Sequence, residues 1–159
     1  MTKILILGGG GMVGQKLAHR ITTTNIFPDA DLTLFDRAFP SDGVQARSVI
    51  GNIANPATAQ GLIAARPDVI FHLAAIVSGQ AEAEFDLGWD VNMMAMWHLL
   101  TALKDEHDAS SGTYRPRVVF TSSIAVYGGP YPDKIDDTFL SAPQTSYGAQ
   151  KAACELMLS

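Results

Sequence analysis

Short aliphatic runs alternate along the chain with longer stretches in which apolar residues recur every three or four positions. A short apolar run bounded by turn-forming residues is typical of a buried strand, and the longer period is typical of an amphipathic helix. Strands and helices that alternate in this way indicate a parallel sheet covered on both faces. The predicted strands are Lys3–Leu7, Asp31–Phe35, Ser48–Ile50, Val69–Leu73 and Arg117–Thr121.

The predicted helices lie between these strands. The first covers Met12–Thr24, and a short one follows Pro56, a residue that suits the first turn of a helix. A longer helix is predicted over Ala81–Glu106, and the last begins near Thr145-Ser146 and continues to the end of the chain. The fold class that this order predicts is α/β, a Rossmann-type doubly wound parallel sheet with helices on both faces.

The second half of the long predicted helix, from Val91 to Leu103, is apolar around most of its circumference. Such a helix is buried on more than one side. We therefore expect either a homodimer that pairs through this helix or further protein that covers it. The segment His107–Pro116 has turn-forming residues and no periodicity, so a surface loop is predicted there. A sixth strand of a complete doubly wound sheet is missing, which predicts that the chain is the N-terminal part of a longer protein.

The composition is that of a folded globular protein. Of the 159 residues, 47% are hydrophobic and 17% are charged, which is too apolar for a disordered chain. The net charge is -5 with only 11 Lys and Arg residues, so no nucleic-acid partner is expected, because such binding depends on clustered basic residues. No apolar run suits a membrane span or a signal peptide, and the single cysteine, Cys154, cannot form an internal disulfide. We therefore predict a cytoplasmic protein with no membrane partner.

A run of four glycines follows the first predicted strand and opens the first predicted helix. Glycines let the backbone approach a pyrophosphate, and the helix offers free N–H groups and its positive dipole end to the phosphates. Two registers fit, Gly9-x-Gly11-x-x-Gly14 and the wider Gly8-x-x-Gly11-x-x-Gly14. A glycine match by itself is equally compatible with a simple tight turn.

An acidic residue at the end of the second strand strengthens the dinucleotide interpretation. Asp36 lies 22 residues beyond Gly14, where a carboxylate can accept hydrogen bonds from the adenosine ribose hydroxyls. The same carboxylate would repel the 2′-phosphate of NADP, so NAD is the predicted cofactor. Arg37 is the feature that argues for NADP, since a guanidinium can pair with that phosphate.

Tyr147 and Lys151 lie four residues apart and share one face of the last predicted helix. Lowering a tyrosine pKa from about 10 to about 7 requires roughly 4 kcal/mol, and a cation about 5 Å away supplies on the order of 3 kcal/mol at an effective dielectric near 20. Lys151 would make Tyr147 a base for a substrate hydroxyl. Ser122-Ser123 follow the fifth strand, where a serine can hydrogen-bond the same oxygen. For the Tyr–Lys spacing alone, a packed ring with a surface-directed amine is the alternative.

These motifs, in this order, resemble the extended short-chain dehydrogenase/reductase family, the NAD-dependent group that includes nucleotide-sugar epimerases and dehydratases. The resemblance covers essentially the whole chain and implies a smaller C-terminal substrate domain after an NAD-binding Rossmann domain at residues 1–159. The other landmarks are Phe71-His72-Leu73-Ala74-Ala75, Asn92, Ser122-Ser123-Ile124-Ala125-Val126-Tyr127-Gly128 and Tyr147-Gly148-Ala149-Gln150-Lys151.

The resemblance also implies roles for individual residues. Ser123, Tyr147 and Lys151 correspond to the catalytic residues. Gly51-Asn52-Ile53 stands where the family usually has Gly-Asp before a hydrophobic residue, and Asn52 can still bond adenine. The implied cofactor contacts are Gly8, Gly11, Met12, Val13, Gly14, Asp36, Asn52, Ile53, Leu73, Ala74, Ala75, Asn92, Tyr147 and Lys151, and the implied substrate contacts are Ser78, Ser123 and Tyr147.

The segment around Ser78 is similar to that of family members that oxidise the C2 hydroxyl of D-erythronate, a four-carbon sugar acid. This implies an enzyme of carbohydrate metabolism with a small sugar-acid substrate. Ile124 and Ala125 stand where the dehydratases carry an Asp-Glu pair, which disfavours dehydration. A nucleotide-sugar epimerase and a non-catalytic dinucleotide sensor are the alternatives.

His72 is interpreted as structural, and no metal site is predicted.

Overall fold

The structure is a computed structural model that describes residues 1–159. Its five strands form one parallel sheet with the order β3-β2-β1-β4-β5. The predicted parallel sheet is confirmed, and each strand differs from its predicted bounds by at most one residue at one end. The strands are β1 (Lys3–Leu7), β2 (Asp31–Asp36), β3 (Arg47–Ile50), β4 (Val69–His72) and β5 (Arg117–Phe120).

The chain divides into two compact units. The first, which we call the sheet unit, comprises Met1–Ala75 and His98–Thr121, and the second, the helical unit, comprises Ile76–Trp97 and Ser122–Ser159. None of the helices in the chain combines the length and the apolar character that a bilayer crossing requires.

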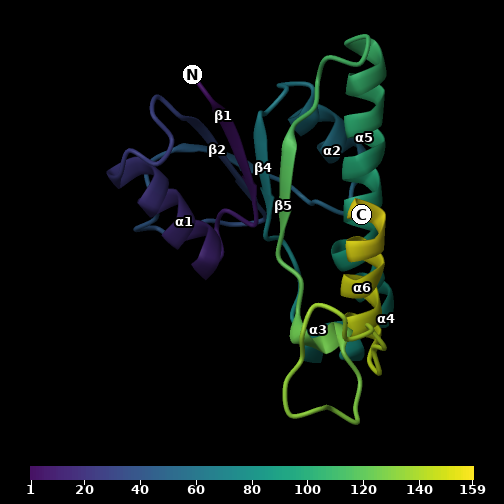
Figure 1. Cartoon of the computed structure of the whole chain (residues 1–159). Helices are drawn as coiled ribbons and strands as arrows, with labels where there is room; N and C mark the ends of the chain where they lie inside the picture. Colours follow the sequence, from purple (N-terminus) through teal and green to yellow (C-terminus); the bar gives the residue numbers. More distant parts are fainter. The chain divides into compact units, whose positions relative to one another are not determined.

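In the sheet unit, α1 (Met12–Thr23) and α2 (Pro56–Ile63) lie on opposite faces of the sheet (Figure 1). Alternate residues of a strand point to opposite faces, so one set of strand residues meets α1. Burial of these apolar side chains is the main force that holds α1 on the sheet. The buried cluster between them consists of Ile4, Ile6, Leu32 and Leu34 from the strands and Ala18 and Ile21 from α1.

The helical unit contains most of the remaining helices. α6 (Ser146–Leu158) contacts all four of the other short helices of this unit. These are α3 (Ser78–Ala83), α4 (Phe85–Trp89), the π-helical turn η1 (Asp90–Met94) and the 3-10 turn η2 (Ile124–Val126). The first turn of α5 (Ala95–Ala109) also belongs to this unit, and the rest of α5 belongs to the sheet unit.

The prediction of one continuous helix over Ala81–Glu106 is wrong. The chain leaves helical geometry at Glu84, where φ is -119° and ψ is 71°, and it forms a π turn at Asp90–Met94. The apolar pattern does not reveal either break, because the buried positions remain close to helical spacing on both sides. The exposed fraction of Trp97 is 54%, whereas Met96 and Leu99 are buried, so the helix is not covered all round.

The predicted loop at His107–Pro116 begins later than expected. Helix α5 continues to Ala109, so its last turn includes residues predicted as loop. An ion pair of 2.7 Å joins Lys104 Nζ and Asp108 Oδ2 one turn apart on this helix. Pairs at this spacing support helix ends modestly. Residues 110–116 are non-helical, as predicted.

Candidate active site

The glycine loop is tied to the sheet by its backbone. The N–H groups of Gly8 and Gly9 both donate to the carbonyl of Phe35 at 2.9 Å. Gly8 has a φ of +88°, and a Cβ added there would lie 2.7 Å from the backbone nitrogen of Ala74. A Cβ added at Gly14 would lie 2.2 Å from the Gly8 carbonyl oxygen. Both positions therefore require glycine for the loop to fold in this form.

Gly11 differs from these two glycines. It is the N-cap residue of α1, and a Cβ added to it would meet only the Gly8 oxygen, at 3.4 Å. No side chain caps this helix, no acidic residue lies in its first turn, and Met12 and Val13 are exposed. An uncapped helix N-terminus with open space beside a glycine fits a pyrophosphate. The chain thus has the geometry that a bound dinucleotide needs at this loop.

Asp36 lies at the end of β2 beside the glycine loop. Its Oδ2 accepts a hydrogen bond from the Gly10 N–H at 2.9 Å, and its Oδ1 accepts one from the Arg37 N–H at 2.7 Å. The carboxylate is therefore held in a fixed orientation while it remains partly exposed. Each carboxylate oxygen has a further lone pair for a ribose hydroxyl. The Arg37 side chain is exposed.

Gln15 is a residue of this site that the sequence does not single out. Its Nε2 donates to the carbonyl of Gly9 at 2.6 Å, and its Oε1 accepts from the N–H of Val44 at 2.8 Å. The side chain therefore links the glycine loop to the segment between β2 and β3. A glutamine on an amphipathic helix is usually a surface residue, so only the structure reveals this link.

The other predicted cofactor residues of the sheet unit follow β3 and β4. Asn52 is exposed and its Oδ1 accepts from the Ala54 N–H at 3.1 Å, whereas Ile53 is buried. Leu73 and Ala74 are half-buried and Ala75 is exposed, directly after β4. These segments and the glycine loop leave the sheet at the carboxyl ends of parallel strands, the edge at which such sheets bind ligands.

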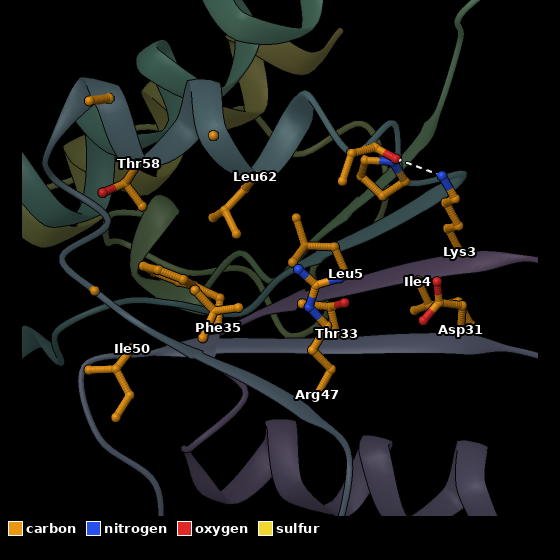
Figure 2. Close-up of a pocket in the computed structure, with 16 residues that line it drawn as sticks. Lys3, Ile4, Leu5, Asp31, Thr33, Phe35, Arg47, Ile50, Thr58 and Leu62 are labelled. Carbon is orange, nitrogen blue, oxygen red and sulfur yellow. Dashed lines mark hydrogen bonds between the residues drawn. The ribbon is translucent and has the colours of Figure 1, made fainter.

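A pocket of about 370 Å³ lies elsewhere on the sheet, on the face covered by α2. Figure 2 shows Leu5, Phe35 and Leu62 on its walls and Arg47 at the strand side. None of the glycine-loop residues lines it. It approaches the predicted adenine residues only through Ile50 and Gly51.

In the helical unit, α6 carries Tyr147 and Lys151 one turn apart. The Lys151 Nζ lies 5.9 Å from the centre of the Tyr147 ring. Lys151 is almost completely buried, and burial lowers the pKa of its ammonium group. Tyr147 is half-buried. The predicted tyrosine–lysine pair therefore has the proximity that an electrostatic effect on the phenol requires.

Ser123 is held next to the helix that carries Tyr147. Its Oγ accepts a hydrogen bond from the Ala125 N–H at 3.2 Å and caps η2. A Cβ added at Gly148 would lie 2.2 Å from the Ala125 carbonyl oxygen. The glycine after the tyrosine thus allows α6 to approach the Ser123–Ala125 segment. Ser122 and Ser78 are exposed in the same unit.

Glu82 of α3 is a second residue that the sequence does not single out. Its Oε1 accepts hydrogen bonds from the Tyr147 N–H at 2.8 Å and from the Ser146 Oγ at 2.9 Å. These bonds, above all the one from Tyr147, hold the pKa of the Glu82 carboxyl below its usual value. The carboxylate thereby fixes the first turn of α6, where helix N-terminal N–H groups need acceptors.

Asn92, predicted as a cofactor residue, is buried in η1 and bonded by its side chain to Ile76 and Gln150. The Cys154 Sγ donates to the Asn92 carbonyl at 3.1 Å. Burial raises the pKa of the Cys154 thiol to about 11, so it remains a protonated donor at neutral pH. His72, in the sheet unit, is buried against the ring of Phe120, with ring centres 5.9 Å apart.

Comparisons with known proteins agree with these motifs. Residues 4–159 match the NAD dependent epimerase/dehydratase family. The chain is 43% identical over 165 residues to the D-erythronate dehydrogenase of Cupriavidus necator, covering 98% of this chain and 49% of that protein. It is 36% identical over 160 residues to the D-erythronate dehydrogenase of Haemophilus influenzae, covering 99% of this chain and 49% of that protein. The chain thus spans about half the length of these relatives.

Among solved structures, the chain resembles one described as a nucleoside-diphosphate-sugar epimerase from Agrobacterium tumefaciens. The TM-score is 0.89 and the identity is 43%, over 99% of this chain and 47% of that one. The Rossmann-type fold predicted from the motifs is confirmed by this similarity. The chain therefore belongs to the NAD dependent epimerase/dehydratase family, whose cofactor is NAD.

Proposed function

We propose that the protein containing this chain is an NAD-dependent dehydrogenase that oxidises the C2 hydroxyl of a small sugar acid such as D-erythronate. Two relatives named D-erythronate dehydrogenase, 43% and 36% identical, support this substrate class. The observation that carries the proposal is the buried Lys151 amine 5.9 Å from the centre of the Tyr147 ring, because binding alone does not require a buried amine beside a phenol.

In this proposal the substrate hydroxyl gives its proton to the Tyr147 phenolate, and the Lys151 ammonium group stabilises the phenolate charge and bonds the cofactor ribose. Ser123 hydrogen-bonds the reacting oxygen, and Ser78 contacts the carboxylate end of the substrate. Bound NAD supplies the hydride acceptor. The hydrogen on C2 leaves as hydride while the proton leaves the oxygen, so the alcohol loses two electrons and becomes a ketone.

The sheet unit would hold the cofactor. Gly8, Gly11 and Gly14 shape the pyrophosphate site, and the first N–H groups of α1 at Met12 and Val13 face it. Asp36 would accept hydrogen bonds from the adenosine ribose. The remaining proposed contacts are Asn52 and Ile53 at the adenine and Leu73, Ala74 and Ala75 after β4. Asn92, which is buried, would support cofactor binding through its hydrogen bonds to Ile76.

The decisive test uses the full-length protein with NAD and a panel of four-carbon sugar acids and nucleotide sugars. We expect net NADH formation, followed at 340 nm, with D-erythronate or a close relative. Tyr147→Phe, which removes only the phenolic oxygen, should lower kcat by about 10²- to 10⁴-fold, the usual range for general acid–base catalysis. Full activity of Tyr147→Phe would disprove the proposed proton transfer.

A nucleotide-sugar epimerase is the second candidate, supported by the description of the 43% identical structure from Agrobacterium tumefaciens. An epimerase returns the hydride to its substrate and accumulates no NADH, so conversion of nucleotide sugars without absorbance at 340 nm would favour it. A non-catalytic NAD sensor predicts binding without turnover on either substrate class. Dehydration is disfavoured by Ile124 and Ala125 after Ser123.

We also propose that the protein is a cytoplasmic homodimer of carbohydrate metabolism. Two large apolar side chains of the helical unit support pairing, because Trp97 is 54% exposed and Leu156 is 77% exposed. Exposed aromatic residues are enriched at protein interfaces. Fractionation of cells that express a tagged full-length protein tests the location, and recovery in a membrane or periplasmic fraction would contradict it.

A further inference from the structure

A buried pair of side-chain amides in the helical unit links α6 to the segment that follows β4. Gln150 lies on α6 directly before Lys151 and has no exposed surface, and Asn92 in η1 is 1% exposed. The Asn92 Nδ2 donates to the Gln150 Oε1 at 2.8 Å. Buried amides are retained where their hydrogen bonds specify a particular arrangement.

Asn92 in turn holds both backbone groups of Ile76. Its Oδ1 accepts from the Ile76 N–H at 2.9 Å, and its Nδ2 donates to the Ile76 carbonyl at 3.2 Å. The Asn92 side chain thereby satisfies both backbone groups of Ile76, as a neighbouring β-strand would do. Ile76 directly follows Ala75, the last of the predicted cofactor residues after β4.

The position of Gln150 is not explained by packing. A Cβ added at Gly88 would lie 2.8 Å from the Gln150 Nε2, so α4 makes room for this amide. The Nε2 itself is buried without a hydrogen-bond partner in the chain. A buried donor of this kind destabilises a fold, and an apolar residue of the same size would avoid that cost. Only the Oε1, through Asn92, makes a contact that an apolar residue cannot replace.

We propose that Gln150 is a positioning residue, which orients Asn92 so that the Ile76 segment is fixed for cofactor binding. The next residue, Lys151, takes part in the proposed proton transfer through Tyr147. The role of Gln150 in cofactor binding rests on the proposed function. Its geometry does not depend on the substrate. Gln150 does not touch the reacting atoms in this proposal, and its effect passes through Asn92.

The test compares Gln150→Met with the wild type in the full-length protein. Methionine matches the length of glutamine but has no acceptor for Asn92. Hydrogen exchange of the peptide containing Ile76, measured without cofactor, should be about ten-fold faster, the change expected for one lost hydrogen bond. NADH should bind more weakly by a similar factor in a fluorescence titration, and exchange in the β1 peptide should be unchanged.

Gln60→Met, the same chemical change at an exposed position of α2, is the matched control and should alter neither measurement. Gln150→Glu retains the Oε1 acceptor and should keep exchange at Ile76 close to the wild-type rate, which preserves the test if Gln150→Met does not fold. Unchanged exchange at Ile76 in Gln150→Met would overturn the inference. Faster exchange in a protein that oxidises none of the sugar acids would instead leave the inference standing and refute the proposed function.

Discussion

The amine of Lys151 is buried, with 2% of the residue exposed, and lies 5.9 Å from the centre of the Tyr147 ring. Burial disfavours the charged form, so the pKa in the folded chain is below 10.5, the value for an exposed lysine. Between the folded pKa and 10.5 the unfolded chain binds more protons than the folded chain. The free energy of unfolding should therefore rise with pH in that window as far as Lys151 contributes.

Lys151→Met tests whether Lys151 contributes to catalysis or to the stability of the fold. Methionine removes the buried charge and keeps most of the apolar stem, so we expect a melting temperature at neutral pH equal to or above that of the wild type. Turnover should fall by at least about 10²-fold, because the phenol loses its cation. Lys104→Met, at an exposed lysine of α5, should change neither quantity appreciably. A large fall in melting temperature would show that Lys151 serves the fold.

Alanine substitutions at Gly11 and Gly14 distinguish an effect on cofactor binding from an effect on the stability of the fold. Gly11→Ala adds a methyl group with one neighbour at 3.4 Å, whereas Gly14→Ala adds one only 2.2 Å from a backbone oxygen. We expect Gly11→Ala to keep the melting temperature and to weaken NADH binding by about ten-fold or more, since the methyl would occupy the proposed pyrophosphate site. Gly14→Ala should lower the melting temperature clearly. Equal effects of the two substitutions on both measurements would contradict this assignment.

At the scale of elements, the first turn of α6 depends on a residue from another helix. Glu82 of α3 accepts from the Tyr147 N–H and the Ser146 hydroxyl, and the Thr145 Oγ accepts from the Gly148 N–H at 3.0 Å. Two side-chain acceptors therefore satisfy backbone donors that the helix cannot satisfy itself. The position of Tyr147 is thus set by α3 as well as by α6.

Glu82→Gln tests this capping interaction. The folded pKa of Glu82 is below 4.5, so its contribution to stability is complete above about pH 4.5 and is lost as the pH falls through the folded pKa. Thermal unfolding between about pH 3 and pH 6 should therefore depend less on pH in the variant than in the wild type. Glu84→Gln, at an exposed neighbour, should retain the wild-type dependence. Identical pH profiles for Glu82→Gln and the wild type would refute the role.

The elements that could be predicted from sequence are those with a strong local signal. Apolar runs bounded by turns located all five strands, and glycines after a strand located the loop at β1. The π turn at Asp90–Met94 and the break at Glu84 could not be predicted, because they depend on contacts far along the chain. Asn92, for example, is held by Ile76 and by Gln150, 16 and 58 residues away.

The candidate site was predictable to a similar extent. The sequence places Tyr147 and Lys151 on one helical face, and the structure gives their proximity. Gln15, Glu82 and Gln150 escaped prediction, because a polar residue on a helix is by default solvated. Only for Gln150 did a signal exist, since it precedes a residue predicted to be catalytic and shares a helical face with Cys154.

At the scale of the whole chain, the predicted residues are divided between the two units. The glycine loop and Asp36 belong to the sheet unit, and all three predicted catalytic residues, Ser123, Tyr147 and Lys151, belong to the helical unit. The chain corresponds to about half of its curated relatives.

The proposed homodimer is a prediction at this scale. Trp97→Glu places a charge on the apolar surface that we expect to pair. The variant dimer should therefore dissociate at a higher protein concentration than the wild-type dimer. Light scattering coupled to size exclusion at micromolar concentration measures the mass. Leu140→Glu, which adds the same charge at an exposed loop residue, should leave the mass unchanged. A wild-type protein that is monomeric throughout this range would refute the dimer.

The two backbone hydrogen bonds of Asp36 have a consequence for redesigning cofactor preference. Replacing Asp36 with a small neutral residue, which would leave room for a 2′-phosphate, would also deprive the Gly10 and Arg37 N–H groups of their acceptor. The mutated loop would then be less well ordered toward either dinucleotide. An engineered NADP enzyme would therefore need a replacement acceptor for Gly10 introduced together with a phosphate-binding cation, and a single exchange should lose affinity without inverting selectivity.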